Sequence, residues 1–83
     1  MTNRGKDWNL FQEQVLEHIE NYTVPQYGDK GNDIASEYTT EYCLSQVKKY
    51  QARFGNNARQ GQERLDLLKM AHYIQMAWDG LND

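Results

Sequence analysis

The chain has 83 residues and a net charge of −3, so we expect one domain (residues 1–83) with a small core. No apolar run approaches the ~18 residues needed to cross a bilayer, and the single cysteine excludes a disulfide within the chain. The acidity argues against non-specific duplex binding, and the lack of both a signal peptide and a cysteine pair predicts a soluble protein of the cytoplasm.

The first predicted helix covers residues 7–21. Apolar side chains recur there with helical period and form one stripe: Trp8, Phe11, Val15, Leu16 and Ile19. Asp7 is the expected N-cap.

Residues 22–38 are predicted as a long irregular loop. They contain the chain's one proline, Pro25, and the turn-forming run "GDKGND". Val24 is expected to be extended because it precedes that proline. A loop of this length in so small a domain is typically functional or packed by its own side chains, and we expect an ordered loop.

Two further helices are predicted at residues 39–54 and 60–79. Gly55 and Gly80 follow their last apolar residues, where helix-ending glycines belong. The predicted apolar arc of the second is Cys43, Leu44, Val47, Tyr50 and Phe54, and that of the third is Leu67, Leu68, Ala71, Ile74 and Trp78. Because their connection is short, we expect an antiparallel α-hairpin. The fold class is therefore all-α with three helices.

The centre of this acidic chain is basic. Residues 1–47 carry three basic and eight acidic side chains, whereas residues 48–64 carry five basic and one acidic. The five are Lys48, Lys49, Arg53, Arg59 and Arg64. One interpretation is a contact surface for nucleic acid or a protein partner. The other is that the cations complement a helix C-terminus through its dipole.

The same stretch contains side chains that can stabilise the hairpin. An antiparallel arrangement sets Arg53 or Lys49 against Asp66, which predicts an interhelical ion pair. The residues assigned to this structural role are Tyr50, Gly55, Asp66, Lys69 and Tyr73. The alternative is a small polar site for a nucleotide or another phosphate ligand. Leu65 and Met76 point away from the predicted apolar arc and suggest a weak homo-oligomer.

A carboxylate motif resembles part of a known enzyme family. All-α nucleoside triphosphate pyrophosphohydrolases of the MazG type carry an E-E-x-x-E helix and then an E-x-x-D helix, and Glu63-Arg64-Leu65-Asp66 is similar to the second motif. The first motif is absent. The resemblance implies, as an alternative function, a reduced Mg²⁺-dependent hydrolase or nucleotide-binding protein using Glu41, Glu63 and Asp66.

Residues 49–74 also resemble part of a pattern of small, mostly uncharacterised phage and prophage proteins, approximately G-N-A-I-K-Y-L-x-R-x-G, a gap, then D-L-x-K-A-x-x-Y-L. The matching residues are Lys49, Tyr50, Arg53, Gly55, Asp66, Leu67, Lys69 and Tyr73. The Gly-Asn that leads the pattern is replaced by Ser45-Gln46, and the alanine falls one place later, at Ala71. The resemblance implies an all-α fold and a phage-type origin, and it supplies no catalytic residues.

Our leading functional hypothesis is a non-enzymatic binding or accessory protein without a cofactor. Its basic hairpin end would contact a protein partner or nucleic acid. We expect no contact with a membrane.

Overall fold

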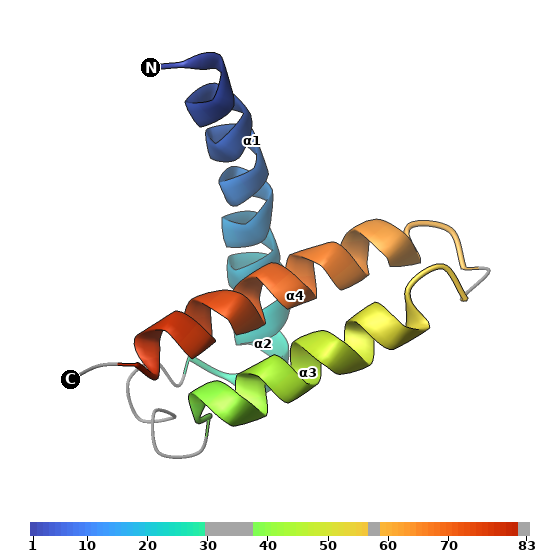
Figure 1. Cartoon of the computed structure of the whole chain (residues 1–83). Helices are drawn as coiled ribbons and strands as arrows, with labels where there is room; N and C mark the ends of the chain where they lie inside the picture. Colours follow the sequence, from blue (N-terminus) through green and yellow to red (C-terminus); the bar gives the residue numbers. More distant parts are fainter. Residues whose placement is uncertain (30–37, 57–58, 82–83) are drawn as a thin grey trace.

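The computed structural model describes residues 1–29, 38–56 and 59–81. Its elements are α1 (Asn3–His18), a π-helical turn η1 (Ile19–Thr23), α2 (Val24–Tyr27), α3 (Thr40–Arg53) and α4 (Gln62–Asp79). The described residues contain no strand. The all-α prediction is confirmed, with three long helices and α3 packed along α4 as a hairpin (Figure 1).

Helix α1 begins earlier than predicted. The Thr2 hydroxyl accepts a hydrogen bond from the Gly5 amide at 3.0 Å, so Thr2 is the N-cap and the prediction of Asp7 is wrong. A threonine at this position satisfies one of the free amides of the first turn, which lets the helix start four residues sooner.

The predicted irregular loop is wrong for residues 22–27. Helix α1 passes directly into the π turn and then into α2, and Gly28, with φ of 89°, ends the run. Val24 is helical (φ −64°, ψ −47°) rather than extended, because Pro25 lies in the first turn of α2, where its missing amide costs no hydrogen bond. The wider π turn before Pro25 also gives its ring room beside the carbonyl four residues earlier. Residues 30–37 of the predicted loop lie outside the described residues.

The hairpin is fixed at both ends. Near the connection, Gly55 follows α3 with φ of +81°, as its predicted helix-ending role requires. At the other end the Thr40 hydroxyl donates to the Ala77 carbonyl at 2.9 Å. Gly80 packs so closely there that a Cβ atom on it would lie 2.7 Å from the Thr40 hydroxyl oxygen. These small residues let the helices approach each other.

The buried face of α4 differs from the predicted arc. The side chains turned toward α3 include Gln62, Asp66 and Ala77, and Cys43 is buried opposite them on α3. Leu67, Ile74 and Trp78, which were expected to be buried, are exposed. Helix α4 is apolar on two sides, and a polar contact with α3 selects which side is buried. Leu65 and Met76, which were expected to point outward, are half-buried.

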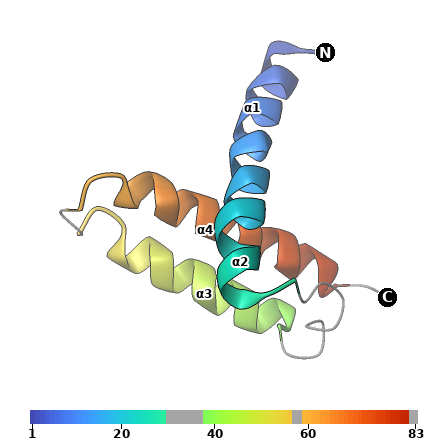
Figure 2. The same cartoon turned by 180° about the vertical axis from the view of Figure 1, so that it is seen from behind.

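Helix α1 crosses the hairpin only with its C-terminal end. Its N-terminal half projects away from α3 and α4 in both views (Figures 1 and 2). No residue of α1 is buried, and Trp8 and Leu16 of its predicted apolar stripe are exposed. Across the described ranges, no helix is long and apolar enough to span a membrane.

Candidate functional site

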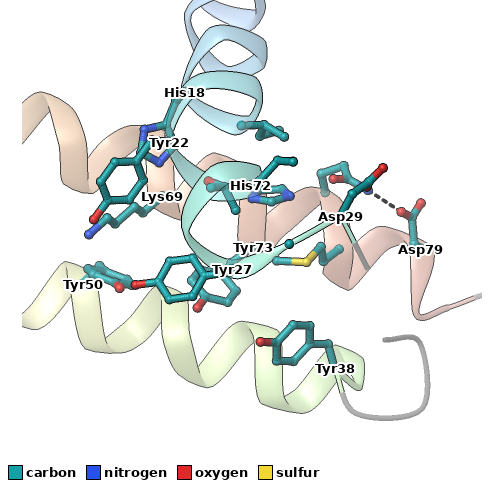
Figure 3. Close-up of a pocket in the computed structure, with 16 residues that line it drawn as sticks. His18, Tyr22, Tyr27, Asp29, Tyr38, Tyr50, Lys69, His72, Tyr73 and Asp79 are labelled. Carbon is teal, nitrogen blue, oxygen red and sulfur yellow. Dashed lines mark hydrogen bonds between the residues drawn. The ribbon is translucent and has the colours of Figure 1, made fainter. Parts of the chain in front are cut away.

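A cavity of about 480 Å³ lies where η1 and α2 cross the hairpin. Five of the six tyrosines line it (Figure 3): Tyr22 of η1, Tyr27 of α2, Tyr38 just before α3, Tyr50 of α3 and Tyr73 of α4. Both histidines, His18 and His72, and Lys69 also line it. The volume falls within the range of small-molecule sites.

Aromatic pairs hold the walls of the cavity. The Tyr50 ring of α3 stacks against the Tyr73 ring of α4 with centroids 6.0 Å apart, and His18 stacks against Tyr22 at 5.0 Å. Burial, followed by the neighbouring tyrosines, raises the pKa of Tyr73 to about 12. The Tyr73 hydroxyl is therefore a hydrogen-bond donor at any physiological pH.

Three cations surround the Tyr50 ring, and we call Lys49, Arg53 and Lys69 the Tyr50 cation cluster. The distances to the ring centroid are 5.8 Å from Lys49 Nζ, 4.5 Å from Arg53 Cζ and 5.5 Å from Lys69 Nζ. Lys69 Nζ is also 5.7 Å from the Tyr22 ring, so it lies between the two tyrosines (Figure 3). Such distances give cation–π attraction.

The cations are only partly neutralised by carboxylate. Burial lowers the pKa of Lys69, and the charge of Arg53 lowers it further, whereas the Asp66 carboxylate opposes the shift. A lysine whose charged form is disfavoured in this way gains from a bound anion.

The predicted interhelical ion pair is confirmed, and its cation is Arg53 rather than Lys49. Arg53 Nη2 donates to Asp66 Oδ1 at 2.8 Å, and the Gln62 amide donates to the same oxygen at 2.8 Å. The Asp66 side chain is 1% exposed, so this carboxylate is buried. Desolvation alone would raise the pKa of Asp66, but the hydrogen bonds from Arg53 and Gln62 outweigh it and the pKa is lowered.

Two buried atoms of this pair have no hydrogen-bond partner, Arg53 Nε and Asp66 Oδ2. One is a donor and the other an acceptor. A small rotation of the guanidinium would join them in the bidentate geometry that arginine and carboxylate favour.

The five predicted basic residues do not form one surface. Arg53 is held by Asp66, and Lys49 lies beside Tyr50. Lys48, Arg59 and Arg64 are solvent-exposed, and none of the five residues lines the cavity. Conversely Tyr50, Lys69 and Tyr73, predicted as structural residues, do line it.

The carboxylates of the alternative magnesium site are not brought together. Glu41 follows Thr40, which contacts the C-terminal end of α4, whereas Glu63 lies at the N-terminal end of α4. The antiparallel hairpin therefore places these two at opposite ends. Asp66 already accepts from Arg53 and Gln62. Among the described residues no cluster of three or more His, Cys, Asp or Glu side chains could hold a metal.

The sequence did not point to Tyr22, Tyr27, His18 or His72 as site residues. Burial and then the charge of Lys69 lower the pKa of His18, and burial and then His18 lower that of His72. The spacing of His18 and Tyr22, four residues apart, is a helical signal that the predicted loop obscured. Cys43 is a buried thiol as predicted.

A scan of protein-family models, a search of curated proteins and a search of solved structures each found no match to this chain. The function must therefore be argued from the geometry of the site.

Proposed function

We propose that this protein is a non-enzymatic binding protein that takes single-stranded nucleic acid at the tyrosine-lined cavity. The observation that supports it is the Tyr50 cation cluster, in which three cations meet around one aromatic ring beside a cavity lined by four more tyrosines. Proteins that bind single strands combine these two features, a positive groove for phosphates and aromatic rings for bases.

Each part of the cavity has a role in this proposal. Bases stack on the exposed rings of Tyr22 and Tyr27, which the π turn and α2 present to the cavity. Phosphates approach Lys69 and Lys49, because Arg53 is already held by Asp66. A bound phosphate would favour the charged form of Lys69 and offset the repulsion that lowers its pKa.

The sequence led us to expect that the basic end of the hairpin contacts nucleic acid or a protein partner, and the proposal specifies a different surface. The contact surface moves from the tip of the hairpin to its crossing with η1 and α2, and exposed Arg59 and Arg64 become secondary contacts. The alternative is a protein partner, which would be favoured if the protein does not bind nucleic acid. The phage-type origin stays a prediction.

Fluorescence anisotropy with a labelled single-stranded oligonucleotide at low salt tests the proposal. Tyr22→Leu should weaken binding by roughly 5- to 150-fold, the range that corresponds to the loss of one stacking contact. Lys69→Ala, which removes a phosphate contact, should weaken binding and lower the slope of log K against log salt concentration by about 1. The matched controls are Lys6→Ala, an exposed lysine on α1, and Trp8→Leu, an exposed aromatic side chain on α1 that does not line the cavity.

Direct binding of a free nucleoside triphosphate without binding of the oligonucleotide would move the ligand class to mononucleotides. The proposal is wrong if neither ligand binds, or if the cavity variants and their controls weaken binding equally.

A further inference from the structure

The face of the hairpin opposite the cavity carries exposed apolar side chains. We call Leu44 of α3 and Leu67, Ile74 and Trp78 of α4 the uncovered hairpin face; their exposed fractions are 52%, 46%, 53% and 77%. At about 100° per residue, the three on α4 share one side of the helix. The cavity residues Lys69 and Met76 lie on the other side. Among the described residues, α2 and the end of α1 cover the face of the hairpin seen in Figure 2, and no helix covers the opposite face, seen in Figure 1.

No charge interrupts the uncovered hairpin face along α4. The residues on this side between its first and last members are Leu67, Met70, Ala71, Ile74 and Trp78. A surface that meets a copy of itself across a twofold axis must keep like charges apart. The α4 part of this face carries no charge, and on α3 the charged residues one turn from Leu44 are Glu41 and Lys48, which have opposite charges. Contiguous exposed apolar side chains of this kind mark interaction sites rather than ordinary surface.

The accessible surface of the chain is larger than that of a compact monomer of the same mass. The accessible surface is 6745 Å², whereas a compact monomer of 9.8 kDa has about 5,200 Å². The radius of gyration is 13.7 Å against about 12 Å for a compact domain of this length. The projecting half of α1 contributes part of this excess of about 1,500 Å². A standard interface removes about 800 Å² from each partner, so it needs about half of the excess.

We propose that two copies of this chain pack their uncovered hairpin faces together across a twofold axis, which forms a four-helix arrangement. Helical domains bury apolar faces by packing in layers, and a second hairpin is the layer that α3 and α4 lack. The two tyrosine-lined cavities then lie on opposite outer sides of the dimer. This inference does not depend on what the cavities bind.

Sedimentation velocity over a concentration series tests the proposal. The wild type should sediment at twice the chain mass at about 100 µM and dissociate on dilution, since interfaces of standard size reach micromolar affinity or better. Ile74→Glu should raise the dimer dissociation constant by at least about 100-fold, because it buries an unpaired charge in each copy. Leu10→Glu makes the same change at an exposed leucine on the free half of α1 and should leave the dimer intact.

A second measurement uses the wild type alone. For a dimer that dissociates on unfolding, the melting temperature rises with protein concentration. A monomeric wild type, or a melting temperature independent of concentration, would overturn the proposal. So would a dimer that Ile74→Glu leaves intact, or one that Leu10→Glu disrupts, because the contact would then involve α1.

Discussion

Removal of the Arg53 guanidinium would leave the Asp66 carboxylate buried with one hydrogen bond, from Gln62. A hydrogen bond to a charged group contributes about 1.5–3 kcal/mol. The Arg53 side chain is 41% exposed, so water can reach the space it vacates, and we expect Arg53→Ala to lower the free energy of unfolding by about 2 kcal/mol. Asp66→Ala loses both acceptor contacts and should cost about 2–3 kcal/mol.

The two substitutions remove the same contact, so their effects should not add. The double variant is expected to lose about 3 kcal/mol, which corresponds to a coupling energy of about 1–2 kcal/mol. Urea denaturation followed by far-ultraviolet circular dichroism, with every protein at the same concentration, measures all four corners of the cycle. Arg64→Ala combined with Asp66→Ala is the matched control, and its effects should add within about 0.5 kcal/mol.

A coupling energy below about 0.5 kcal/mol for Arg53 and Asp66 would refute this reasoning. It would mean that the ion pair adds little to stability, and that burial of Asp66 is sustained by Gln62 alone. A large coupling in the Arg64 control would equally show that the cycle measures a general loss of structure.

Three further predictions concern the close packing of Gly80 and the ionisation of two side chains. Gly80→Ala should lower stability by about 1–3 kcal/mol in thermal melts, because its Cβ would lie 2.7 Å from the Thr40 hydroxyl oxygen and 3.1 Å from the Thr40 backbone nitrogen. Gly5→Ala should destabilise less, because its Cβ would meet the flexible Met1 side chain at 2.9 Å and the Thr2 hydroxyl oxygen at 3.2 Å, and the higher helix propensity of alanine opposes that cost. Burial lowers the pKa of His72 in the folded protein. Its contribution to stability is therefore complete above about pH 6.5, the unfolded value, and is lost as the pH falls through the folded pKa. In that pH range the melting temperature of His72→Gln should depend less on pH than that of the wild type. Absorbance at alkaline pH should show one tyrosine ionising near pH 12, and Tyr73→Phe should remove that step.

The hairpin could be predicted from the sequence because its determinants are local. Thr39 caps α3 by accepting from the Tyr42 amide, Gly55 adopts the positive φ that ends the helix, and the short connection forces Arg53 toward Asp66. Each of these follows from spacing along one or two helices.

The buried face of α4 and the cavity depend on contacts that the spacing of apolar residues does not predict. Leu67 and Ile74 form a stronger apolar pattern than Asp66 and Ala77, yet the latter face α3, because close approach and an ion pair decide the packing. The cavity requires the crossing of η1 over α4, which follows from the helical course of residues 19–27 through Pro25. A single proline after a valine favours an extended segment or a loop unless the wider turn before it is known.

The π turn η1 also determines how this chain can change in length. A π turn holds one more residue than the α-helical turn it replaces, so deletion of one residue from Ile19–Thr23 would restore α-helical geometry. The helix before it would keep its rotational phase relative to the hairpin, because a π turn takes up its extra residue within one turn. His18 would therefore still face the cavity, and α3 and α4 would keep their contacts. The π turn is thus the place where this chain can lose one residue without turning α1 about its axis.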